Sequence, residues 1–150
     1  MPDAIKSNLQ AEINGRLTTL VNRANSLIIE SVNEALQDFE LTPTQYASLA
    51  MLGCNQGISS AKLARLVNVT PQSMGTIVSK FEERALVTRQ PAEIHSRVMT
   101  LTLTKQGFKL MQAADDAVRI IERRITGSFS QAEIELFKAL LRRIGDTETV

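Results

Sequence analysis

The chain has 150 residues, of which 43% are apolar, 22% are charged and 4% are aromatic. This length suits a single domain, 1–150, and is too short for most multi-domain enzymes. No apolar stretch approaches the ~20 residues that a membrane helix requires, and residues 1–10 lack the apolar run of a signal peptide. One cysteine, Cys54, cannot form an internal disulfide, and one histidine, His95, gives little to a zinc site. We therefore expect a cytoplasmic protein without a metal or catalytic cofactor.

The formal net charge of +1 is distributed unevenly along the chain. Residues 57–105 carry seven Lys or Arg against three Asp or Glu, whereas residues 1–56 carry three against six. Residues 106–150 carry seven of each sign. The basic middle predicts a local anion-binding surface, although a chance fluctuation of surface charge would give the same count.

The first element is a long amphipathic helical segment over about residues 4–39, whose apolar residues recur at steps of three and four. Gly15 can bend or interrupt it. Thirty or more helical residues span roughly 50 Å, more than the diameter of a small domain. We therefore expect this segment and the amphipathic helices at 108–125 and 130–144 to pack on a second copy. The alternative is a monomer in which the terminal helices cover each other.

Helix starts are marked along the chain by a Ser or Thr N-cap between two apolar residues. The predicted caps are Thr42, Ser59, Thr70, Thr104 and Ser130. Gln45 and Glu133 complete capping boxes, and Pro43 and Pro71 occupy first helical positions, where a missing N–H is tolerated. The pattern predicts a mainly α protein.

Two of these helices are short and adjacent. A helix over 59–67 is followed by Asn68, which tolerates a left-handed turn, and Thr70 opens the next helix at once. Helices joined by so few residues must cross steeply, which is helix-turn-helix geometry.

The second of these helices has two distinct faces. At 100° per residue, Ile77, Val78 and Phe81 fall within about 60° of Met74 and form a buried stripe. Gln72, Thr76 and Ser79 lie opposite, with Ser73 and Lys80 beside them. Gln72 can pair with adenine in a major groove, Ser73 and Thr76 can reach bases or phosphates, and the helix N-terminus favours a phosphate. The alternative is a solvent-facing polar helix.

A hairpin follows. Met99–Leu103 alternates apolar residues with Thr, 86–90 is a plausible partner strand, and 91–97 connects them. Arg89 and Arg97 lie on or beside the strands, and His95 lies at the tip. A basic hairpin beside a recognition helix makes a winged helix, with the wing on the DNA backbone or in the minor groove. The alternative for the arginines is ordinary surface charge, or pairing with Glu93.

Four segments together resemble the MarR family of transcriptional regulators. They read LTPTQY at 41–46, AKLA at 61–64, EERALV at 82–87 and RVMTLTLTKQG at 97–107. The resemblance implies a homodimer joined through helical regions 1–40 and 106–150, with winged helix-turn-helix lobes, 41–105, straddling pseudo-palindromic double-stranded DNA. It also implies a repressor that responds to a small aromatic or amphipathic effector, for which the sequence identifies no pocket residue.

Three positions depart from the family pattern. His95 replaces the usual Asp two residues before the wing arginine, so the wing contact is expected to be looser or pH-dependent. Ala85 replaces the usual Gly before the wing, which predicts a slightly different turn. Cys54 does not correspond to the reactive cysteine of oxidant-sensing relatives, and we interpret it as an inert or weakly reactive thiol.

The sequence thus predicts a dimeric DNA-binding regulator. Arg97, with His95, is assigned to the minor groove. The other candidate DNA-binding residues are Lys62, Arg65, Lys80 and Arg89 for phosphates, and Thr70, Gln72, Ser73 and Thr76 at the recognition helix. One alternative is a winged-helix protein-interaction module. An enzyme is the other, although no nucleophile–base pair, metal set or phosphate loop is visible.

Overall fold

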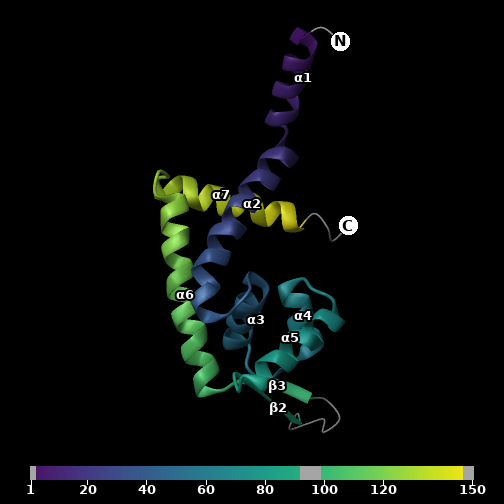
Figure 1. Ribbon diagram of the computed structural model, residues 1–150, viewed down its shortest axis with the longest axis vertical. Coiled ribbons are helices and arrows are strands. Elements are labelled where there is room, and N and C mark those ends of the chain that lie inside the picture. Colours follow the sequence, from purple (N-terminus) through teal and green to yellow (C-terminus); the bar gives the residue numbers. More distant parts are fainter. Residues whose placement is uncertain (1–2, 92–98, 147–150) are drawn as a thin grey trace.

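The chain is mostly helical, and the computed structural model describes residues 3–91 and 99–146. In chain order the elements are α1 (Asp3–Gly15), α2 (Leu17–Leu36), the 3-10 helix η1 (Gln37–Phe39), α3 (Pro43–Cys54), β1 (Ile58–Ser59), α4 (Ser60–Val67), α5 (Pro71–Glu83), β2 (Val87–Pro91), β3 (Met99–Leu103), α6 (Lys105–Thr126) and α7 (Gln131–Asp146). Helices α2 and α6 pack side by side, and α3, α4, α5 and the strands form a lobe at one end (Figure 1). The predicted mainly α fold with a small β-hairpin is confirmed.

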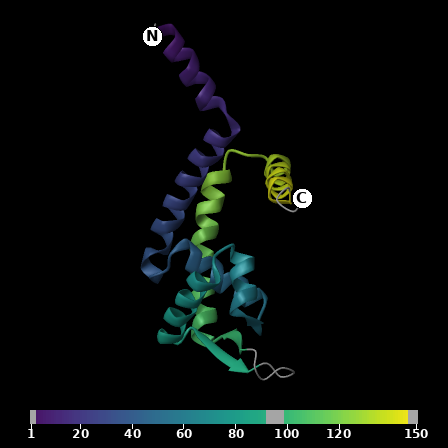
Figure 2. The ribbon, with the colours of Figure 1, turned by 90° about the vertical axis from the view of Figure 1, so that its right-hand side faces the viewer.

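The N-terminal helical segment is interrupted at its glycine. Helix α1 ends at Gly15, and Arg16 is extended, with φ −66° and ψ 138°, before α2 begins. Glycine has a low helix propensity, so the helix breaks at the position where helical structure is least favourable. Helix α1 therefore projects beyond the rest of the chain (Figure 2).

The predicted N-caps are present. The hydroxyls of Thr42, Ser59, Thr70 and Thr104 each accept a hydrogen bond from the backbone N–H three residues on. Before α7, the backbone N–H and hydroxyl of Ser130 donate to Glu133 at 2.8 and 2.7 Å, and these bonds lower the pKa of that carboxyl. These helix starts are set by local sequence, because each cap satisfies an N–H that the helix itself leaves unpaired.

The sheet contains one strand more than the predicted hairpin. Strands β2 and β3 pair antiparallel, with Val87 opposite Leu103 and Pro91 opposite Met99. The short strand β1 adds to the other edge of β3 and gives the order β1-β3-β2. A two-residue strand shows no alternation, so the sequence pattern missed it, and the expectation of a lone hairpin was incomplete.

The core is continuous between the terminal helices and the lobe. Leu36 of α2 and Ala114 of α6 are buried in one cluster with lobe residues. The lobe contributes Leu41, Leu49, Leu52, Leu63, Ala64, Met74, Val78, Phe81, Leu86, Val87, Leu101 and Leu103 to it. Because the lobe and the long helices share this core, the orientation of the lobe depends on the position of the long helices.

The turn from α5 to β2 differs from the sequence-based expectation. Ala85 has φ 54°, the left-handed conformation that glycine favours. Alanine therefore adopts the backbone conformation expected of glycine at this position, and the predicted change of turn is not seen. The turn is enclosed by the start of α6, where a Cβ on Gly107 would clash with the carbonyl oxygen of Leu86 and lie 2.9 Å from its carbonyl carbon. Packing at Gly107 and hydrogen bonds to this turn hold the backbone in place despite the strain at Ala85.

Candidate nucleic-acid interface

Helices α4 and α5 form a helix-turn-helix. Asn68, at the end of α4, has φ 57°, and its N–H donates to the carbonyls of Ala64 and Arg65. Thr70 then caps α5, accepting a hydrogen bond from Ser73 N at 3.1 Å. The left-handed turn and the immediate cap allow the steep crossing predicted from the sequence.

The inner face of α5 is fixed in the core. Met74 and Val78 are fully buried, Phe81 is 1% exposed, and Ile77 is partly buried. The helical arrangement predicted from the sequence is confirmed for this stripe. A recognition helix held in this way does not need to become ordered when it binds.

The outer face of α5 is polar and exposed. Gln72, Ser73, Thr76 and Lys80 all lie on the surface, and so does Ser79, which the candidate set omitted. The hydroxyl of Thr70 donates to Ser73 Oγ at 2.9 Å, and that of Thr76 donates to the Gln72 carbonyl at 3.3 Å. The Gln72 amide has no side-chain partner among the described residues, so both of its donors and its acceptor are available to a base edge.

The cations around this face differ in availability. Lys62 and Arg65 on α4, and Lys80 on α5, are exposed and form no ion pair within residues 3–91 and 99–146. By contrast, Arg89 Nε donates to both carboxylate oxygens of Glu82 at 3.0 Å. A phosphate must therefore compete with Glu82 for Arg89.

Two candidate wing residues, His95 and Arg97, lie outside the described residues. The strands that lead to them are in place, because β2 and β3 remain paired as far as Pro91 and Met99. The hairpin extends from the lobe at the end of α5 (Figure 1). The assignment of these two residues to the minor groove remains a prediction.

Sequence reasoning gave no role to Glu82 or Arg84. Glu82 restrains Arg89, as described above, and the Arg84 guanidinium bonds to backbone carbonyls more than 40 residues away in the chain. Periodicity could not reveal either contact, because each depends on where separate elements lie in space. The sequence shows that Glu82 and Arg84 are charged, but it does not show which groups they contact.

A second candidate site is an open groove of about 750 Å³ beside α6 and α7. Tyr46 of α3 donates to Asp115 Oδ1 at 2.7 Å, and Arg119 Nε donates to Asp115 Oδ2 at 2.7 Å. Burial, followed by the hydrogen bond to Asp115, raises the pKa of Tyr46 above its ordinary range. The groove combines these groups with apolar walls that include Phe129 and Phe137.

Other kinds of site are less prominent. The described part of the chain has no group of three His, Cys, Asp or Glu side chains arranged to hold a metal ion. Cys54 is exposed at the end of α3. Among residues 3–91 and 99–146, no helix combines the length and apolar character needed to cross a membrane.

Comparison with known proteins identifies the same architecture. A model of the MarR family matches residues 41–94. The HTH-type transcriptional repressor Rv2887 of Mycobacterium tuberculosis is 32% identical over 126 residues, which are 84% of this chain and 91% of that protein. The transcriptional regulator HosA of Escherichia coli is 28% identical over 108 residues, 72% of this chain and 80% of its own.

Solved structures agree with this comparison. Rv2887 in complex with DNA superposes with a TM-score of 0.73 at 31% identity, covering 87% of this chain and 98% of that one. Rv2887 with salicylic acid gives a TM-score of 0.69 at 32% identity, over 87% of this chain and 96% of the other. The repressor CouR bound to a 23-mer DNA duplex has a TM-score of 0.84 over 89% of this chain and 95% of its own. At 22% identity, that last likeness shows the fold alone.

The helix-turn-helix, its buried inner face and the paired strands after it define a winged-helix transcriptional regulator. Relatives of that class align with most of this chain and with most of their own length. The chain belongs to the MarR family.

Proposed function

We propose that the protein is a homodimeric repressor that binds pseudo-palindromic double-stranded DNA and releases it when a small organic ligand binds. The observation that carries this proposal is the exposed polar face of α5 above a fully buried inner face. Such a helix is rigid, available and suited to a major groove. Regions 1–40 and 106–150 would join the two copies, and the lobe 41–105 would contact DNA.

Exposed apolar side chains on the terminal helices support the dimer. Leu17 is 66% exposed, Leu136 60% and Leu27 58%. A groove of about 450 Å³ between α2 and α7 is lined largely by such residues, including Leu140. Contiguous apolar surface of this kind is typical of a protein interface. A second copy would remove it from water.

The dimer is tested by light scattering after size-exclusion chromatography. Leu140→Glu places a charge in the groove and should shift the protein towards the monomer, with loss of operator binding. Leu66→Glu, on an exposed residue of α4 outside that groove, is the matched control and should remain dimeric. A monomeric wild-type protein would contradict the proposal.

DNA recognition is tested with duplexes that the wild-type protein selects from a random pool. Binding is then measured by fluorescence anisotropy over a range of salt concentrations. Lys80→Gln should weaken binding to selected and random DNA alike and reduce the salt slope by about one. Gln72→Ala should instead reduce the preference for selected over random DNA. Equal wild-type binding to both pools would favour the protein-interaction alternative.

We assign the ligand to the groove beside α6 and α7. Its apolar walls carry Arg123, which forms no ion pair among the described residues, and Arg119, for which a ligand would compete with Asp115; such a site suits an aromatic carboxylate. The relative Rv2887 has been crystallised with salicylic acid, which makes salicylate a suitable probe. Salicylate should lower DNA affinity, and neutral salicylamide should have less effect. The intrinsic fluorescence of Tyr46, in a chain with one Tyr and no Trp, reports binding once the light absorbed by the added ligand is corrected for.

We propose that the protein acts by binding and not by catalysis. We also propose that it acts in the cytoplasm, where its DNA resides. Transcriptional regulation is the activity named for its relatives. Turnover of any substrate by the purified protein would contradict this part of the proposal.

A further inference from the structure

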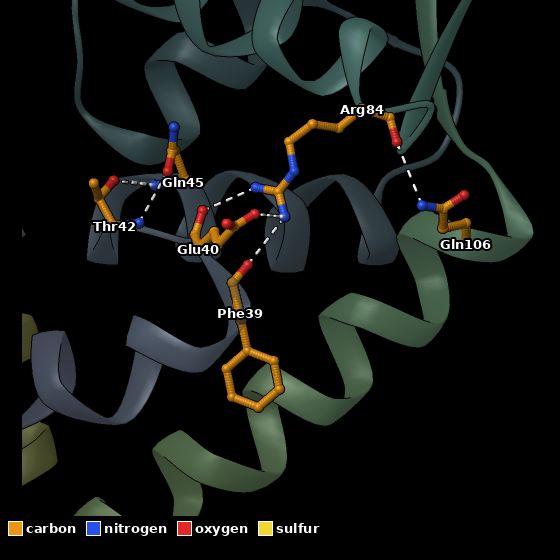
Figure 3. A network of polar contacts seen from close by, with 6 residues as sticks. All are labelled: Phe39, Glu40, Thr42, Gln45, Arg84 and Gln106. Atoms are coloured by element: carbon orange, nitrogen blue, oxygen red, sulfur yellow. Dashed lines mark hydrogen bonds and ion pairs between the residues drawn. The ribbon is translucent and has the colours of Figure 1, made fainter.

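One arginine links the end of the recognition helix α5 to the N-terminal arm, which consists of α1, α2 and η1 and ends at Glu40. Arg84 is the C-cap of α5 and directly follows Glu83, the last residue of the helix. Its Nη1 donates to the carbonyl oxygen of Glu40 at 2.8 Å, and its Nη2 donates to that of Phe39 at 3.0 Å (Figure 3). Both carbonyls lie where α2 and η1 end and the chain turns towards α3.

These carbonyls are suitable partners for a guanidinium. Glu40 has φ 53° and ends η1 in a left-handed conformation, which leaves carbonyls of the last turn without helical partners. The end of a helix also carries partial negative charge. The planar fork of Arg84 offers two parallel donors, and its positive charge strengthens both bonds.

The Glu40 side chain contributes little to this contact. Its carboxylate lies 3.9 Å from Arg84 Nη2 and is 85% exposed. Exposed ion pairs of this kind add little stability. Arg84 is therefore held mainly by backbone atoms, and the contact does not require the carboxylate of Glu40.

The same end of α5 is also linked to α6. Thr104, the N-cap of α6, donates through Oγ1 to the Ala85 carbonyl at 2.7 Å and through its N–H to the Leu86 carbonyl at 3.0 Å. Gln106 Nε2 lies 3.5 Å from the Arg84 carbonyl, which it faces (Figure 3). The C-terminal end of α5 thus contacts η1, which follows α2, and the start of α6.

The geometry points to Arg84 as a positioning residue for operator recognition. It fixes the angle between the recognition helix and the N-terminal arm, and so the distance between the two recognition helices of a dimer. The inference rests on the proposed function. Twelve residues separate Arg84 from Gln72 at the other end of α5, about 18 Å along a helix. Arg84 therefore acts on spacing and not on the base contacts made near Gln72.

Spacing matters because a dimer binds two half-sites at once. The second contact is intramolecular, and its advantage is lost when the geometry does not match. A lobe released from the arm samples more orientations and binds the complete operator less tightly. Contact of either lobe with a single half-site does not depend on this angle.

The experiment measures binding of full-length variants to duplexes selected by the wild-type protein. One set contains the complete operator, one contains a single half-site, and a third changes the half-site separation by one or two base pairs. Arg84→Met removes the fork and the charge but keeps an apolar stem. Arg84→Lys keeps the charge alone, and Glu40→Gln, the matched control, removes the side-chain ion pair but keeps the carbonyl.

We expect Arg84→Met to lower affinity for the complete operator by about tenfold and for the half-site by less than about twofold. Its spacing preference should broaden and its salt slope should stay unchanged. Arg84→Lys should be intermediate, and Glu40→Gln should resemble the wild type. Circular dichroism and urea unfolding check that each variant is folded. If Arg84→Met does not fold, the ratio of operator to half-site affinity in Arg84→Lys provides the same test.

Three results would overturn this role. Equal losses on operator and half-site, or a salt slope reduced by about one, would make Arg84 a direct phosphate contact. An unchanged operator affinity and spacing preference would show that the contact does not position α5. A wild-type protein that selects no duplex from the random pool would instead refute the proposed function itself.

Discussion

Replacing Ala85 with glycine should stabilise the protein. Ala85 has φ 54°, and a left-handed conformation costs an L-residue roughly 1–2 kcal/mol. Glycine removes that strain but adds about 0.4–1 kcal/mol of conformational entropy to the unfolded chain. Ala85 is exposed, so losing its methyl group sacrifices little packing. The net gain is about 0.5–1 kcal/mol for each protomer, or about 1–4 °C in Tm for a chain of this length.

The assay is urea unfolding followed by circular dichroism, at one fixed protein concentration because dimers unfold in a concentration-dependent way. Gly57→Ala is the matched control. Gly57 has φ 79°, and a Cβ there would meet no atom within 4 Å, so its effect isolates backbone strain. This variant should be destabilised by about 1 kcal/mol. If Ala85→Gly lowered the unfolding midpoint with an unchanged m-value, the strain assigned to this turn would be wrong.

Three further outcomes follow from particular contacts. Gly107→Ala should destabilise the protein by at least about 2 kcal/mol in urea unfolding, because its methyl group would overlap the α5–β2 turn; a neutral effect would show that the turn can move. A near-ultraviolet absorbance titration should show Tyr46 ionising above its ordinary pKa range, with Asp115→Asn lowering that pKa only partly, since burial is the larger cause. Because the folded pKa is raised, the associated stability is present below the unfolded pKa and is lost as pH rises through the folded value. Glu82→Gln should free Arg89 and raise DNA affinity several-fold in anisotropy measurements, with a steeper salt dependence; unchanged binding would mean that Arg89 does not contact DNA.

Features that depend on neighbouring residues could be predicted from the sequence. The N-caps at Thr42, Ser59, Thr70 and Thr104 were predicted correctly, because a cap and the N–H that it accepts from lie three residues apart. The buried and exposed faces of α5 follow from helical periodicity for the same reason. The left-handed turn at Asn68 was visible in the residue type itself.

The turn at Ala85 shows where local reasoning failed. Alanine gives no signal for a positive φ, and the conformation is imposed by the hydrogen bonds from Thr104 and by the close approach of Gly107. The third strand was likewise invisible, because β1 is defined by pairing with β3 and not by its own two residues.

The sequence by itself determined where α3 to α7 begin, which face of α5 is polar and which family the chain resembles, because these properties reside in neighbouring residues and short motifs. Only the tertiary structure decided which charges are available. Arg84 is engaged by carbonyls more than 40 residues away and Arg89 by Glu82, while Lys62, Arg65 and Lys80 remain unpaired within the described residues. The physical reason is that a charge is engaged only when a partner lies within hydrogen-bond distance. For side chains on different elements, that distance is set by packing and not by separation along the chain.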